Sequence, residues 1–144
     1  MSRATQAAAL LNSSSLNCAQ CTLSVFCEEL GMDKNDTLKV ALAFGAGMGR
    51  TDGRCGAVTG AYMVLGLRPY PGLTPAEHKE KVYSLVQEFN KKFKALNKSL
   101  NCSDLLGCDI STPEGLAAAR SSKAFSNQCP KAIADAVAIL EEMD

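Results

Sequence analysis

Apolar side chains recur at a helical period along nearly the whole chain. The clearest example is the segment 75–96, where apolar residues return every three or four positions and charged pairs four residues apart occupy the other face. Thr74-Pro75-Ala76-Glu77 is a capping box with proline at the first helical position, which marks the start of this helix. The segment is therefore predicted to be a long amphipathic helix with one packed face.

The rest of the chain follows the same period, with serine, glycine and proline between the segments. No run alternates at period two over enough residues to predict a strand. The glycine-rich segment 45–49 is expected to be a loop, because glycine tolerates positive φ and close backbone approach. The predicted helices cover residues 3–12, 17–30, 35–42, 56–67 and 75–96, two short segments from 101 and 112, and 130–142. We therefore expect an all-α fold, a single compact domain of about six to eight helices over residues 1–144.

Charge and hydropathy exclude several classes of partner. Fifteen basic residues balance fifteen acidic ones, so the chain has no excess of positive charge for nucleic acid or anionic lipid. The apolar run at the N-terminus is shorter than a secretory signal needs. The uncharged apolar stretch between Arg54 and Arg68 falls short of the about 20 residues of a membrane span. We expect a cytoplasmic protein with no nucleic-acid partner and no membrane insertion.

The seven cysteines are the feature of the sequence that says most about function. In a reducing compartment, thiols act as metal ligands, redox groups or small buried side chains, and an odd number cannot pair completely within one chain. Four of them fall at predicted helix starts: Cys18, Cys55, Cys102 and Cys129. Backbone N–H groups at a helix start stabilise an anion, so the pKa of such thiols is expected to be lowered. A site shared by these four must be assembled by tertiary packing, and simple core filling stays open as the alternative.

The other cysteines carry weaker signals. Cys18 and Cys21 form a CxxC pair that can face one side of a helix, but no second CxxC completes a zinc ribbon and no strand precedes it. Cys27 lies on the apolar stripe of its segment and is predicted to be core. Cys108 follows Cys102 closely enough to be an accessory thiol. His78, the only histidine, is predicted to lie on the surface.

Small residues follow Cys55 in the predicted helix 56–67. Gly56 and Gly60 are four residues apart, with an alanine after each. A glycine inside a helix costs about 0.5–1 kcal/mol relative to alanine, so a close neighbour must compensate. That neighbour is either another helix or a cofactor held by Cys55, and both interpretations stay open.

Together these motifs resemble the C_GCAxxG_C_C family of redox-active proteins over nearly the full length. The resemblance implies a small bacterial or archaeal helical protein with a redox function. A related module in the split-Soret cytochromes carries an iron–sulfur cluster of the 2Fe–2S type, whereas haem attachment does not carry over because the chain has no CxxCH. Three thiols depart from the four-cysteine pattern. The matching segments are Asn17-Cys18, Gly47 to Gly60 with Cys55-Gly56-Ala57-Val58-Thr59-Gly60, Asn101-Cys102 with Leu105-Leu106-Gly107, and Ser111 to Gly115 before Cys129-Pro130.

Three hypotheses follow from the residues and the resemblance. The first is a redox or electron-transfer protein in which Cys18, Cys55, Cys102 and Cys129 bind an iron–sulfur cluster, with 2Fe–2S favoured and Gly56 and Gly60 beside it. The second is a metal-free thiol–disulfide oxidoreductase with Cys55 or Cys18 as the nucleophile. The third is a structural zinc site with four cysteine ligands. A redox partner protein is expected, a homodimer is one assembly the sequence allows, and whether the protein is an enzyme stays open.

Overall fold

The computed structural model describes all 144 residues and contains nine α-helices and no strand. The all-α prediction is confirmed, and the helix beyond the predicted number lies in the glycine-rich segment. One arginine and one asparagine, Arg54 and Asn101, form an isolated antiparallel bridge. The helices are α1 (Arg3–Ser13), α2 (Cys18–Ser24), α3 (Lys34–Leu42), α4 (Gly45–Arg50), α5 (Gly56–Leu67), α6 (Pro75–Asn97), α7 (Cys102–Leu106), α8 (Pro113–Ser121) and α9 (Ala124–Glu142).

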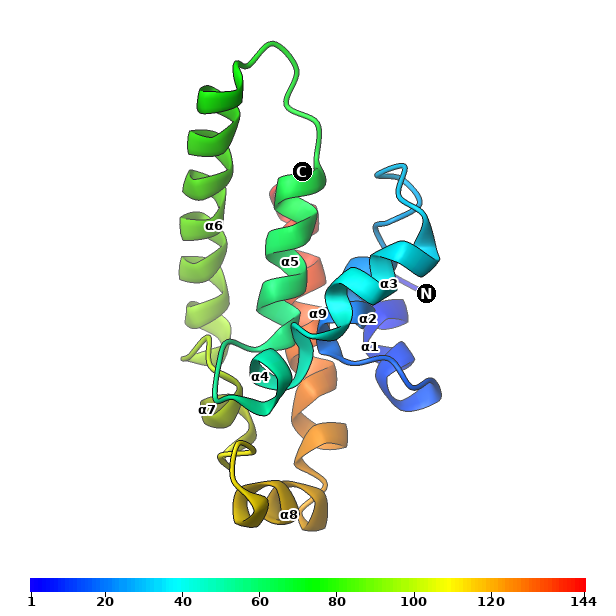
Figure 1. Cartoon of the computed structure of the whole chain (residues 1–144), viewed down its shortest axis with the longest axis vertical. Coiled ribbons are helices and arrows are strands. Elements are labelled where there is room, and N and C mark those ends of the chain that lie inside the picture. Colours follow the sequence, from blue (N-terminus) through cyan, green and yellow to red (C-terminus); the bar gives the residue numbers. More distant parts are fainter.

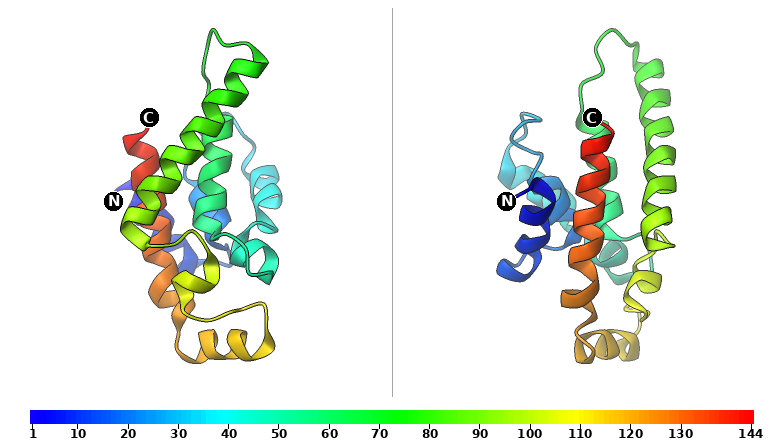
Figure 2. Two further views of the ribbon diagram at one scale, coloured as in Figure 1. Left: turned by 90° about the vertical axis from the view of Figure 1, so that its left-hand side faces the viewer. Right: turned by 180° about the vertical axis from the view of Figure 1, so that it is seen from behind.

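Helices α5 and α9 lie side by side at the centre of the molecule (Figure 1). The long helix α6 flanks them on one side, and α1, α2 and α3 flank them on the other. Seen from behind, α1 packs along α9, and the short helix α8 closes one end of the molecule (Figure 2). This arrangement leaves α5 and α9 covered on most of their surfaces.

The burial of each helix follows this arrangement. Helix α6 contributes only Phe89 and Phe93 to the buried core, as its amphipathic pattern predicts. Helices α5 and α9 each contribute eight buried residues because neighbours cover them on several sides. A single cluster of 28 buried residues joins the helices, and five of the seven cysteines belong to it. No helix combines the length and the apolar run needed to cross a bilayer.

The last helix begins earlier than predicted. It starts at Ala124, after Lys123 in the left-handed conformation (φ 58°), and it continues through Pro130. The prediction that Pro130 marks a helix start, with Cys129 at the N-terminus, is therefore wrong. Proline removes one backbone N–H donor, but Cys129, Ala132 and other buried side chains on both sides hold the helix against the core. The second helix is also shorter than predicted, since it ends at Ser24 and turns follow as far as Gly31.

The glycine-rich segment forms a left-handed turn rather than an irregular loop. Four successive residues, Ala46 to Gly49, have φ between 54° and 73° and ψ between 34° and 53°. The positive φ expected of glycine occurs at Gly47 and Gly49, but Ala46 and Met48 adopt it as well. A left-handed residue other than glycine costs roughly 1–2 kcal/mol. The Gly47 carbonyl accepts hydrogen bonds from the N–H groups of Thr51 (3.2 Å) and Gly53 (2.9 Å), which close the turn.

Candidate functional site

Four cysteine side chains from four different helices line one small cavity of about 20 Å³. They are Cys18 of α2, Cys55 at the N-cap of α5, Cys102 of α7 and Cys129 of α9. Each is between 5 and 8% exposed, so the cavity lies just beneath the surface. The four thiols that the sequence singled out are therefore neighbours in space.

The backbone holds Cys55 and Cys102 next to each other. The Cys55 N–H donates to the Leu100 carbonyl at 2.7 Å, and the Cys102 N–H donates to the Gly53 carbonyl at 3.0 Å. These two bonds flank the bridge between Arg54 and Asn101. The segments before α5 and α7 are thus joined, and both deliver a cysteine to the cavity at a helix start.

Cys18 is positioned by the cap of α2. Asn17 and Gln20 form a capping box, with the Gln20 N–H donating to Asn17 Oδ1 and the Asn17 N–H donating to Gln20 Oε1. The Asn17 side chain also donates to the Leu42 carbonyl at 2.8 Å, which ties the start of α2 to the end of α3. Cys18, at the first helical position, is therefore fixed by side-chain hydrogen bonds on either side of it.

Gly56 and Gly60 have different surroundings. A Cβ on Gly56 would lie 2.9 Å from the Cys18 Cβ, and Gly56 also lines the cysteine cavity. A Cβ on Gly60 would lie 2.7 Å from the Ala19 carbonyl oxygen, and Gly60 does not line the cavity. Gly60 therefore allows helix α2 to pack closely against α5. Gly56 allows the same contact and also lines the cysteine cavity.

Burial, rather than the helix dipole, controls most of the thiol pKa values. Burial raises the pKa of Cys55 to about 11, although the nearby backbone N–H groups of Ala57 and Val58 oppose the shift. Those amides approach the sulfur without completing a capping hydrogen bond of ordinary geometry. Burial likewise raises the pKa of Cys102 to about 12. The expectation of lowered pKa values at these helix starts is therefore wrong for the metal-free thiols.

Cys18 and Cys129 behave as a hydrogen-bonded pair. The interaction between the two side chains raises the pKa of Cys18 and lowers that of Cys129; burial adds to the first shift and opposes the second. The thiol whose pKa is lowered is thus the one that lies inside a helix. Its stabilising donor is a neighbouring thiol and not a row of backbone amides.

A family model described as "Putative redox-active protein (C_GCAxxG_C_C)" matches residues 16–143. The chain belongs to the C_GCAxxG_C_C family. The resemblance seen in the sequence is confirmed, and the family description supports a redox-active protein. No curated protein and no solved structure gives a significant match to the chain.

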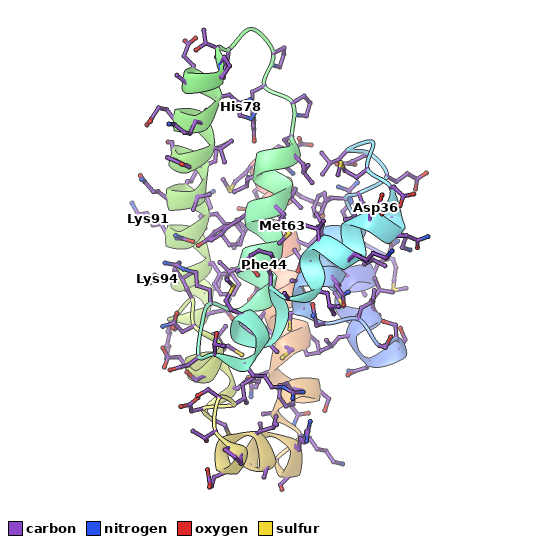
Figure 3. The ribbon with its side chains drawn as sticks, viewed as in Figure 1. Asp36, Phe44, Met63, His78, Lys91 and Lys94 are labelled. Carbon is purple, nitrogen blue, oxygen red and sulfur yellow. The ribbon has the colours of Figure 1, made fainter.

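The remaining cysteines of this C_GCAxxG_C_C protein lie outside the cavity. Cys27 is buried and its thiol donates to the Ser24 carbonyl at 3.1 Å, as expected of a core residue. Cys21 is buried on α2 and does not line the cavity with Cys18. Cys108 is half-buried. His78 packs edge-on against Tyr70 at the far end of α6 from the cysteines (Figure 3).

Four further residues line the cavity, and none of them was predicted from the sequence as a site residue. Leu105 and Leu106 of α7 and Ala132 of α9 are apolar, and Gln128 is polar. Leu105 and Leu106 lie three and four positions after Cys102, and Ala132 lies three after Cys129. Residues at these spacings share a helix face with the cysteine, so helical periodicity counted from each cysteine was the signal that could have found them.

The cysteine set of this C_GCAxxG_C_C protein can be compared with the groups it is expected to hold. No three His, Cys, Asp or Glu side chains stand close enough together to hold one metal ion. A zinc ion needs its thiolate ligands at about 2.3 Å from a single point. An iron–sulfur cluster distributes four cysteine ligands over more than one iron, so its ligands stand further apart. By number and type, the four thiols match the ligand set of either group.

Proposed function

We propose that this protein transfers electrons by means of an iron–sulfur cluster, of the 2Fe–2S type, bound by Cys18, Cys55, Cys102 and Cys129. The observation that carries the proposal is the meeting of four cysteines from α2, α5, α7 and α9 in one buried cavity. Such a cluster supplies a reversible one-electron couple. Membership of a redox-active family supports this chemistry.

The surrounding residues are suited to this role. Leu105, Leu106 and Ala132 contribute apolar side chains to the wall of the cavity. The amides of Ala57 and Val58 already favour the charged form of Cys55, and hydrogen bonds to cluster sulfurs tune a reduction potential. The cysteines are only slightly exposed, so an electron can pass to a protein docked over them without direct contact with solvent. We therefore expect a redox partner protein.

The first experiment is anaerobic purification and reconstitution with iron and sulfide. We expect iron and acid-labile sulfide in equal amounts, visible charge-transfer bands, and a paramagnetic signal after one-electron reduction. Serine at any of the four cavity cysteines should abolish or strongly reduce the bands. Cys27→Ser and Cys108→Ser are the matched controls and should retain them, because both thiols lie outside the cavity. A protein that stays colourless after reconstitution, with its fold intact by circular dichroism, contradicts the proposal.

A second function, metal-free thiol–disulfide exchange, rests on Cys18 and Cys129, which line the same cavity and influence each other's pKa. In this reaction the Cys129 thiolate attacks a substrate disulfide and releases one substrate thiolate. Cys18 then attacks the mixed disulfide and releases the second, so the substrate gains two electrons and a Cys18–Cys129 disulfide forms. Alkylation across a glutathione redox titration should trap this disulfide in metal-free protein. Cys55 and Cys18, the nucleophiles predicted from the sequence, are the competing assignments in the same experiment.

A structural zinc site is the third candidate, and metal analysis separates it from the other two. Zinc would be retained without colour, and a chelator would unfold the domain because metal affinity becomes folding free energy. Membership of a redox-active family makes this the least favoured of the three, because zinc has no redox chemistry.

A further inference from the structure

An apolar groove runs along α5 where α3 and α4 leave it uncovered, and we call it the α3–α5 groove. It consists of two adjoining hollows of about 540 and 290 Å³, which share Val40 and Met63 as walls. Figure 3 shows Phe44 and Met63 on this face, where α3 approaches α5. The first hollow is also lined by Phe44, Met48, Arg54 and Tyr62, and the second by Leu23, Met32 and Leu67.

The groove has a single charged side chain, and it stands at one end. Arg54 precedes α5 and lines only the first hollow. Its guanidinium donates to the Tyr62 hydroxyl at 2.9 Å, and Tyr62 in turn donates to Asn90 of α6. Arg54 takes part in none of the three ion pairs of the molecule. It is therefore a positioned cation without an acidic partner.

The other polar groups of the groove are already used. The Thr59 hydroxyl donates to the Phe44 carbonyl at 3.0 Å, and the Thr37 hydroxyl donates to the Asp33 carbonyl at 2.6 Å. Neither hydroxyl has a free proton to offer a ligand. Recognition in the groove thus reduces to apolar contact along its length and one positive charge at its end.

The groove exposes apolar surface that folding alone does not explain. Val40 is 61% exposed, and Met32 and Met48 are each 39% exposed. Met48 is also held in the left-handed backbone of α4, which costs free energy. Contiguous exposed apolar side chains mark binding sites more often than isolated ones do.

We propose that the α3–α5 groove binds an elongated apolar small molecule with one anionic group at its end, such as the carboxylate of a long-chain acid. Arg54 takes the anionic group, and the apolar chain lies along Val40 and Met63. The larger hollow has the volume of a small-molecule site. The 12 residues of α5 between Arg54 and the far end of the groove span about 18 Å, so the ligand is long rather than round. The proposal does not depend on what the cysteines hold.

The test uses cis-parinaric acid, a long-chain polyene acid that fluoresces when it leaves water, and its uncharged methyl ester. We expect saturable binding of one molecule of acid per chain. Arg54→Gln should weaken binding of the acid at least tenfold and leave the ester unchanged, because only the acid uses the charge. Val40→Asp should weaken both, because it places a charge on the apolar wall. Leu96→Asp, at an equally exposed apolar residue of α6 outside the groove, is the control and should change neither.

Three outcomes overturn the proposal. Fluorescence that rises without saturation shows that the groove has no site. If Arg54→Gln weakens binding of the acid and of the ester equally, the arginine affects only the shape of the groove. A concentration-dependent dimer that Val40→Asp dissociates, with no probe binding, shows that a second copy of the chain covers the groove instead.

Discussion

At the scale of single residues, the four cavity thiols differ in how strongly they hold their protons. Burial raises the pKa of Cys55 and Cys102, whereas the hydrogen bond from Cys18 lowers the pKa of Cys129. A metal must displace protons from the first two before it can bind them. Loading the site should therefore release protons and proceed more readily above neutral pH.

The pair Cys18 and Cys129 gives a residue-level prediction for the reduced, metal-free protein. Cys129 should react with iodoacetamide faster than the other three cavity thiols near neutral pH, because the thiolate is the reacting form. Cys18→Ala removes the hydrogen-bond donor, which is worth about 1 kcal/mol, and should slow Cys129 about fivefold. Mass spectrometry of the modified peptides measures both rates.

Cys27→Ala is the matched control for this experiment, since Cys27 is buried on the same part of the chain but bonds to the Ser24 carbonyl. It should leave the Cys129 rate unchanged. If Cys55 or Cys18 reacts first in the unmodified sequence, the direction of the proposed hydrogen bond is wrong.

At the scale of elements, the crossing of α2 and α5 fixes the geometry of the site. Gly56 and Gly60 let the two helices approach so closely that any larger side chain meets α2. Cys18 and Cys55 sit at the starts of these two helices, and the contact therefore sets their separation. The crossing therefore brings together two cysteines that lie 37 residues apart in the sequence.

Three glycines of α5 give the element-level prediction. Gly60→Ala should destabilise the fold by about 1–3 kcal/mol, because its Cβ would lie 2.7 Å from the Ala19 carbonyl oxygen, a backbone atom. Gly56→Ala should cost a similar amount, with its Cβ at 2.9 Å from the Ala19 nitrogen. Gly66→Ala should stabilise by about 0.5–1 kcal/mol, since nothing lies within 4 Å of its Cβ and alanine favours the helix.

Urea unfolding of the metal-free variants measures these differences. Gly66→Ala is the internal control, because it makes the same chemical change on the same helix. Equal changes in the free energy of unfolding for Gly60→Ala and Gly66→Ala would show that helix propensity, and not contact with α2, determines the effect.

The elements also show what could be predicted from the sequence and what could not. Caps and periodicity placed α6 within a residue or two, and they placed Cys18 and Cys102 at helix starts. Pro130 misled the prediction, because proline signals a start only where the preceding backbone is not already helical, and tertiary burial keeps α9 helical before it. The left-handed conformation of α4 could not be predicted from the sequence, since Ala46 and Met48 have no local preference for positive φ.

At the scale of the whole molecule, burying thiols makes the stability of the metal-free protein depend on pH. Burial raises the folded-state pKa of Cys55 to about 11, above its ordinary value of 9.0. Between these values the unfolded chain releases a proton that the folded chain retains. The contribution of Cys55 to the free energy of unfolding is thus fully present below pH 9 and is lost as the pH rises towards 11.

The prediction concerns the difference in the free energy of unfolding between the unmodified sequence and a cysteine variant at the same pH. Contributions from titrating groups that both proteins share are thereby subtracted. The stability advantage of the unmodified sequence over Cys55→Ala should shrink above pH 9, by at most about 1.4 kcal/mol per pH unit. Urea unfolding at pH 7, 8, 9 and 10 measures this slope. An advantage over Cys55→Ala that stays constant from pH 7 to pH 10 would contradict the prediction.

The placement of Cys129 in the last helix has a consequence for biosynthesis. A growing chain presents Cys18, Cys55 and Cys102 before α9 has been made, and α9 is also the helix against which α1, α5 and α6 pack. A partly synthesised chain therefore offers three thiols that nothing yet holds together. The fourth thiol and the packing that orders the first three arrive in the same segment. On the proposed function, the four-cysteine site can therefore bind metal only after α9 has been made.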